Sequence, residues 1–161
     1  MATFGLQLEE SKTRLIEFGR FAENNRRKRG PEKPETFTFL GFTHYCSKDR
    51  YGKRFRVKRK TSKKKFNKKL KALHTKIKNM RNLPVADIIS YLNKVLTGYY
   101  RYYRITDNMR SLKLLEDNIE RILFFWLNRC SQKRSYTWEG YKELLKLLPL
   151  AKPKIYVSIY G

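Results

Sequence analysis

The chain has 161 residues, of which 40% are hydrophobic and 14% aromatic, and this composition excludes a disordered polar chain. Its 38 Lys and Arg against 14 Asp and Glu give a formal net charge of +24 and a pI near 10.2, which is typical of proteins that bind a polyanion. No run approaches the about 18 apolar residues of a membrane span, and residues 1–20 lack the pattern of a secretory signal. We therefore expect a cytoplasmic protein that binds nucleic acid and not a membrane.

The first third of the chain is expected to form β hairpins. Apolar and polar residues alternate in 4–8, and an extended apolar pattern resumes in 14–18 after a turn, which predicts a first hairpin. The polar segment 23–35 contains one Gly and two Pro and predicts a loop. Residues 37–45, interrupted by a glycine, and a return strand around 55–57 predict a second hairpin with one apolar and one cationic face.

The remaining two thirds predict four helices. Ser62 is a plausible N-cap for the first, Pro84 suits the first turn of the second, and the third should start at residue 107 or 108. Thr137 should cap a short fourth helix, and residues 155–160 alternate like a terminal strand. The expected core positions are Phe66, Leu70, Leu73 and Ile77 in the first helix; Ile88, Leu92, Val95, Leu96 and Tyr99 in the second; Leu112, Leu115, Ile119, Ile122, Leu123 and Trp126 in the third; Trp138, Tyr141, Leu144, Leu145 and Leu148 in the fourth.

Positive charge is concentrated in residues 48–81, which contain seventeen Lys or Arg and a single acid, Asp49. A run of charge is usually a solvated face, but here no i to i+4 acidic partner offsets the repulsion between neighbouring lysines. We therefore expect this segment to contact phosphates.

A second cluster lies in residues 98–104, where four tyrosines and two arginines occupy seven positions near the end of a predicted helix. The rings could stack on bases while the guanidinium groups contact phosphates. Alternatively, Tyr99, Tyr102 and Tyr103 could be core rings with hydroxyls that reach water. The two interpretations have equal weight on the cluster alone, and the charge of the whole chain favours nucleic acid.

Cys46 and Cys130 are isolated, with no CxxC motif or His at ligand spacing. Both are predicted to be reduced structural thiols, so neither a metal nor a disulfide framework is expected.

Three motifs follow one another in the helical part of the chain: Ile77-Lys78-Asn79-Met80-Arg81-Asn82-Leu83-Pro84, Leu92-Asn93-x-x-Leu96-x-Gly98-Tyr99-x-x-Tyr102-Tyr103 and Trp126-Leu127-Asn128-Arg129. This ordered series resembles the maturase-specific domain, also called the thumb or domain X, of group II intron reverse transcriptases. The likeness extends upstream through 5–14 and Phe39-Leu40-Gly41-Phe42, and downstream through 131–138 and 153–156. Phe-Leu-Gly-Phe alone is a weak signal, whereas the whole series in one order is specific.

The resemblance implies an α+β fold, with N-terminal β hairpins from a partial palm followed by a helical thumb of three to four helices. It divides the chain into a partial palm with a primer-grip hairpin at 1–60, maturase-specific helices at 61–136, and a terminal helix and strand at 137–161. Leu40, Gly41 and Phe42 correspond to the primer grip, and Lys12 to a lysine that could assist a leaving group. The family's Tyr-Ala-Asp-Asp motif and its separate upstream Asp are absent, so the chain alone cannot hold the two Mg²⁺ ions of the complete enzyme, and we expect no cofactor and no catalytic residue.

The favoured hypothesis is an RNA-binding maturase module that grips intron RNA or a template-primer duplex and assists RNA splicing. One alternative is half of a split RNA-directed DNA polymerase, completed by an N-terminal reverse transcriptase fragment. The other is an inactive remnant of a retroelement. The expected nucleic-acid-binding residues are Arg54, Arg56, Lys58, Arg59, Lys60, Lys63, Lys64, Lys65, Lys68, Lys69, Lys76, Lys78, Arg81, Tyr99, Tyr100, Arg101, Tyr102, Tyr103, Arg104, Arg129, Lys133 and Arg134.

Overall fold

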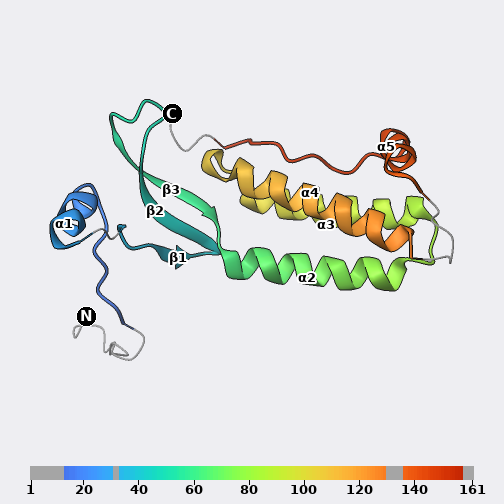
Figure 1. Ribbon diagram of the computed structural model, residues 1–161, viewed down its shortest axis with the longest axis horizontal. Coiled ribbons are helices and arrows are strands. Elements are labelled where there is room, and N and C mark those ends of the chain that lie inside the picture. The colour runs from blue at the N-terminus through green and yellow to red at the C-terminus, as the bar shows by residue number, and fades with distance from the viewer. Residues whose placement is uncertain (1–12, 31–32, 130–135, 158–161) are drawn as a thin grey trace, which may run out of the picture. The chain divides into compact units, whose positions relative to one another are not determined.

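The computed structural model describes residues 13–30, 33–129 and 136–157 (Figure 1). The chain divides into two compact units. The first comprises residues up to 39 together with 43–58, and the second comprises 40–42 together with 59 onward. The short turn at 40–42 thus belongs to the helical unit, although the strands on either side of it belong largely to the first unit.

The sheet has three strands in the order β1-β2-β3, formed by β1 (Phe37–Phe39), β2 (Phe42–Lys48) and β3 (Phe55–Thr61). Two residues connect β1 and β2, so this pair is an antiparallel hairpin, as the interruption at Gly41 predicts. Exposure does not alternate along β3, because residues 55–59 are all half-buried. Apolar and cationic residues of this strand are therefore exposed to a similar degree.

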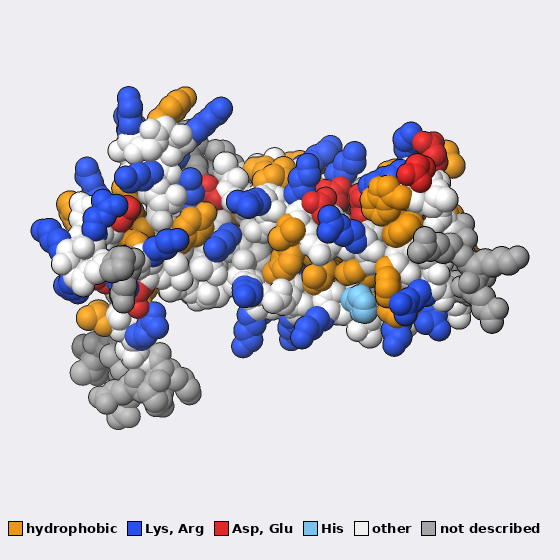
Figure 2. Space-filling model, viewed as in Figure 1, with side chains coloured by type: hydrophobic (Ala, Val, Ile, Leu, Met, Phe, Trp, Pro, Cys, Tyr) orange, Lys and Arg blue, Asp and Glu red, His pale blue; other side chains and the backbone are white. Residues whose placement is uncertain are grey.

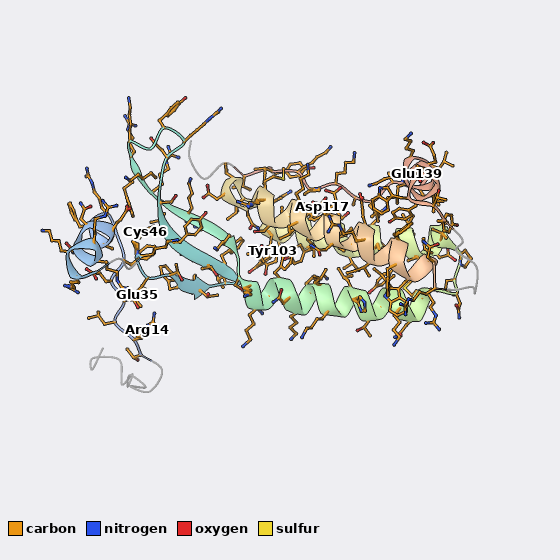
Figure 3. The ribbon with its side chains drawn as sticks, viewed as in Figure 1. Arg14, Glu35, Cys46, Tyr103, Asp117 and Glu139 are labelled. Atoms are coloured by element: carbon orange, nitrogen blue, oxygen red, sulfur yellow. The ribbon has the colours of Figure 1, made fainter. Side chains whose placement is uncertain are left out.

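Two expectations for the N-terminal third of the chain are wrong. Residues 14–18 form no strand, and the segment read as a loop contains a helix, α1 (Ala22–Arg29). Carboxylates outside α1 explain the helix, since Arg26 lies 3.5 Å from Glu17 and 3.4 Å from Glu35. Glu35 also accepts a 3.0 Å hydrogen bond from Arg14, and Figure 3 labels both residues. These tertiary ion pairs stabilise a polar helix that lacks an apolar stripe. The first strand of the predicted hairpin, 4–8, lies outside the described residues.

Cys46 is half-buried and free in this unit. Its Sγ accepts from the backbone N–H of Gly19 at 3.5 Å and donates to the Gly19 carbonyl at 3.6 Å. These two contacts tie the middle of β2 to the segment before α1. Cys130 lies outside the described residues.

The second unit is a helical bundle (Figure 1). Its elements are α2 (Lys63–Met80), α3 (Val85–Tyr103), a single 3₁₀ turn (Thr106–Asn108), α4 (Met109–Leu127) and α5 (Trp138–Leu147). The expected caps are confirmed, since Ser62 accepts from the N–H of Lys65 and Thr137 accepts from the N–H of Gly140. The α+β fold class, with a sheet followed by helices, is confirmed.

The core of the bundle is built largely from the stripes that the helical periodicity predicts, but Trp138, which was expected in the core, is 41% exposed. The fully buried positions are Ile77 of α2, Ile88, Leu92 and Leu96 of α3, and Leu112, Leu115, Ile119 and Leu123 of α4. Tyr141 of α5 is also fully buried, and its hydroxyl donates to the Glu120 carbonyl at 2.9 Å. The predicted terminal strand is reduced to one parallel bridge between Ile105 and Val157 within the described residues.

Candidate nucleic-acid interface

Helix α2 presents a ridge of lysines on the side opposite its core positions. Lys64, Lys68 and Lys71 are exposed and follow i, i+4, i+7 spacing, whereas Leu73 and Ile77 are buried on the other side. Figure 2 shows this cationic edge as blue side chains beneath α2. We call Lys64, Lys68 and Lys71 the lysine ridge.

The other α2 lysines lie on the flanks, where several rest on aromatic rings of neighbouring helices. Lys69 lies 5.9 Å from the ring of Tyr99, Lys76 lies 5.3 Å from that of Tyr91, and Lys78 lies 5.7 Å from that of Trp126. Burial also lowers the pKa of Lys69. Cation–π contacts thus give these three a structural role that the lysine ridge does not have.

The lysine ridge is not neutralised by its own protein. Helix α2 has no acidic residue, and none of its lysines lies within 4.0 Å of a carboxylate in the part of the chain that the structure describes. Like charges at i, i+4 spacing repel, so this arrangement costs stability unless an external anion offsets it.

A buried asparagine fixes the position where α2 begins. Asn108 is 0% exposed, and its Oδ1 accepts from the backbone N–H of Thr61 at 2.7 Å. Its Nδ2 donates to the Thr61 hydroxyl at 2.8 Å and to the Tyr103 carbonyl at 3.0 Å. The network joins the residue before the N-cap of α2 to the end of α3. The helical periodicity marked Asn108 only as a helix start, because nothing local signals its burial.

The tyrosine cluster contacts the turn formed by Leu40, Gly41 and Phe42. The Tyr102 hydroxyl donates to the Leu40 carbonyl at 2.9 Å. The Phe42 ring lies 5.0 Å from the Tyr103 ring in an edge arrangement and 6.1 Å from the Tyr102 ring, nearly parallel to it. Two sets of residues that the sequence singled out separately are therefore adjacent; Figure 3 labels Tyr103.

The backbone of this turn is unusual. Leu40 has φ +47° and Gly41 has φ +80°, so both central residues adopt the left-handed conformation of a two-residue hairpin turn. A leucine in this conformation costs about 1–2 kcal/mol. Its side chain is 66% exposed and so recovers little of that cost by burial. A strained, exposed apolar tip is a feature that often accompanies a binding site.

The four tyrosines of the cluster differ in exposure. Tyr100 and Tyr103 are 5% and 7% exposed, so the core-packing interpretation applies to them and their faces are closed to bases. Tyr99 is half-buried, and burial raises its pKa to about 12. Tyr102, at 56% exposed, is the ring of the four that offers the most surface for stacking.

The remaining expected residues are dispersed. Arg54 and Lys60 are exposed at the two ends of β3, and Arg56, Lys58 and Arg59 between them are half-buried. In the helical unit, the Arg81 guanidinium lies 5.8 Å from the Trp126 ring, that of Arg129 lies 4.4 Å from the Phe125 ring, and Arg101 is exposed. Lys12, Lys133 and Arg134 lie outside the described residues. Lys71 completes the lysine ridge but was not singled out as a site residue, because only the helical geometry groups it with Lys64 and Lys68.

Comparison with known proteins agrees with this bundle. Residues 63–144 match the family described as "Group II intron, maturase-specific domain", a span that runs from the start of α2 into α5. The chain belongs to this family. Its function is therefore of the group II intron maturase type, and the resemblance to the C-terminal part of such proteins is confirmed. No curated protein sequence and no solved structure matches the chain.

The matched span places the features described above within or beside the maturase-specific domain. The lysine ridge, the tyrosine cluster and Asn108 all lie inside residues 63–144, whereas the Leu40–Phe42 turn lies outside it. No helix among the described residues is long and apolar enough to span a membrane.

Proposed function

We propose that the maturase-specific domain of this chain binds RNA, either structured intron RNA or a template-primer duplex, and thereby assists RNA splicing. The observation that carries the proposal is the lysine ridge, three exposed cations in a row on a helix without acidic residues. Phosphates would replace the repulsion within the ridge by attraction and would release condensed counterions.

This surface favours recognition of backbone over recognition of bases. A lysine ammonium is a flexible point charge, and it lacks the planar, rigid donor pair by which arginine, asparagine or glutamine select a base edge most sharply. An α-helix also cannot enter the deep, narrow major groove of an RNA duplex, so α2 would lie across phosphates at the groove edge. The ridge would therefore recognise the shape and charge of RNA rather than its sequence.

The exposed end of the Leu40–Phe42 turn supplies a second contact in this proposal. Leu40 is 66% exposed and Tyr102, which holds the Leu40 carbonyl, is 56% exposed. Together they form an apolar and aromatic tip on which the terminal nucleotide of a strand could rest. The resemblance of this turn to a primer grip supports the same role.

A salt series on two triple variants tests the ridge. The variant Lys64→Gln, Lys68→Gln, Lys71→Gln removes the lysine ridge, and Lys65→Gln, Lys69→Gln, Lys76→Gln removes the same charge from a flank. We expect the ridge variant to reduce the slope of log affinity against log salt by about 2, since each phosphate contact contributes about 0.7 to 0.9. The flank variant should change the slope less.

The probe is a structured group II intron RNA, measured by filter binding, with helicity by circular dichroism as the control for folding. Equal slopes for the two variants would place the RNA surface elsewhere. A splicing assay then follows the rate at which the same RNA splices with and without protein. Tight binding without any acceleration would limit the function to RNA binding.

A further inference from the structure

A second cationic site lies away from the lysine ridge, between the end of α3 and the segment that follows α5. It is a cavity of about 360 Å³, within the range of small-ligand sites. Its lining includes four cations and two phenol rings, namely Arg101, Arg104, Lys152, Lys154, Tyr100 and Tyr156. No carboxylate lines it among the described residues.

The four cations come from two separate segments that converge. Arg101 and Arg104 stand three positions apart at the end of α3, where a helix end by itself favours cations. That reason does not extend to Lys152 and Lys154, which reach the same cavity from the extended chain after α5. None of the four lies within 4.0 Å of a carboxylate that the structure describes. Their convergence therefore concentrates positive charge that no ion pair among the described residues neutralises, although Glu116 lies close enough to Lys152 to interact with it electrostatically.

Tyr100 lines the cavity, but its hydroxyl oxygen is buried away from solvent. Burial raises the pKa of Tyr100, and the nearby carboxylates of Glu116, Asp117 and Glu120 raise it further. The four cations, and not this hydroxyl, are therefore the groups that an anion in the cavity would meet.

The rim of the cavity is aromatic. The Arg104 guanidinium lies 4.8 Å from the centre of the Tyr156 ring, which is 65% exposed. Stacking holds the guanidinium plane while leaving its edge N–H groups free to donate. Arg104 is half-buried as a result, which reduces the entropy that it loses when it binds an anion.

From these observations we propose that the cavity is a phosphate-binding site, with Arg104, Arg101, Lys152 and Lys154 supplying charge-assisted hydrogen bonds. A phosphate has several acceptor oxygens, which suits a site of donors that approach from two segments. The site does not depend on the lysine ridge, because it lies on different elements. The phosphate could belong to an RNA strand or to a free nucleotide, and both offer the same chemistry.

Inorganic pyrophosphate is the first probe, titrated into the full chain at low salt by calorimetry. We expect saturable binding at one site per chain. The variant Arg104→Gln, Lys154→Gln should weaken it by at least about tenfold, because two charge-assisted hydrogen bonds are lost. The matched control Lys94→Gln, Arg110→Gln removes one Lys and one Arg from exposed positions of α3 and α4 outside the cavity and should change affinity less than about twofold.

Equal pyrophosphate affinity in wild type, the Arg104/Lys154 variant and the Lys94/Arg110 control would overturn the proposal. So would pyrophosphate binding that does not saturate.

Competition then identifies the source of the phosphate. Displacement of pyrophosphate by a short RNA with a 5′-hydroxyl assigns the site to internal phosphodiesters. Displacement only by the same RNA with a 5′-phosphate assigns it to a strand end, and displacement by neither assigns it to a free nucleotide. The Lys64/Lys68/Lys71 variant should bind pyrophosphate normally, so failure of the RNA proposal and failure of this one are distinguishable.

Discussion

A Cβ atom on Gly41 would lie 2.7 Å from the hydroxyl oxygen of Tyr103, so the turn at 40–42 fits against the end of α3 only with a glycine at this position. Gly41 also has φ +80°, which residues with a side chain rarely adopt. The backbone N–H of Ser62 donates to the Gly41 carbonyl at 2.9 Å. Gly41 therefore connects the turn, the N-cap of α2 and the tyrosine cluster.

Replacing Gly41 with Ala should lower the free energy of unfolding by about 2–4 kcal/mol, because a steric conflict with Tyr103 adds to backbone strain. Gly52→Ala is the matched control, since Gly52 has φ +71° and open space around it. It should cost only the strain, about 1 kcal/mol. Urea unfolding measures both. Equal losses of unfolding free energy in the two variants would show that the Tyr103 side chain can move aside without an energetic cost.

Asn108→Ala should destabilise the protein by about 3 kcal/mol, because it leaves the buried Thr61 N–H without an acceptor and creates a small cavity. Asn118→Ala removes a 2.6 Å hydrogen bond to the Leu114 carbonyl at an exposed site of α4 and should cost less than about 1 kcal/mol. Thermal unfolding followed by circular dichroism compares them. A similar loss in both variants would contradict the special role of the Asn108 network.

Substituting an exposed tyrosine should mainly weaken RNA binding, whereas substituting a half-buried tyrosine should mainly lower stability. Tyr102→Leu should weaken RNA binding by about 1–3 kcal/mol if a base stacks on the ring. Its effect on stability should be small, because the side chain is 56% exposed. Tyr99→Leu should lower the melting temperature instead, since Tyr99 packs against the core and lies 4.5 Å from the Tyr103 ring. The reverse pattern in filter binding and melting experiments would assign Tyr102 a packing role.

Alkaline pH should destabilise the bundle through its buried tyrosines. Burial raises the pKa of Tyr99 from 10.0 to about 12 and raises those of Tyr100 and Tyr141 as well. The unfolded chain then releases these protons at lower pH than the folded chain, so their contribution is complete below pH 10 and is lost as pH rises toward 12.

Lysines also lose their charge in this range, which relieves repulsion and acts in the opposite direction. The comparison of wild type with Tyr99→Phe isolates the tyrosine contribution. We expect the unfolding free energy of the variant to fall less steeply between pH 10 and 12. Urea unfolding at each pH measures the slope, and ultraviolet absorbance of phenolate reports ionisation. Parallel curves would show that Tyr99 ionises equally in both states.

The helical part of the fold was largely predictable because its signals are local. Ser62 and Thr137 are caps that their own sequence contexts mark, and the buried stripes follow helical periodicity. Helix α1 was missed because its stabilising partners, Glu17 and Glu35, lie outside it in the sequence. Of the expected terminal strand, the described residues 155–157 form a single bridge, because alternation shows that a segment can pair but not how long its partner is, and residues 158–160 lie outside the described part of the chain.

The candidate site was predictable in composition but not in arrangement. The excess of lysine in α2 is evident from the chain, yet Lys69, Lys76 and Lys78 lie on rings that belong to other helices. The composition of residues 98–104 also gives no sign that Tyr100 and Tyr102 differ in exposure, whereas the structure leaves the first 5% and the second 56% exposed.

The sequence by itself determined the charge, the helices with their caps and the family, because each depends on residue type and on spacing within a few turns. Only the tertiary structure decided which lysines form the ridge, which tyrosines remain exposed, and that Arg104 and Lys154 reach one cavity. The physical reason is that burial and convergence depend on contacts between segments far apart in the chain, and local periodicity carries no information about them.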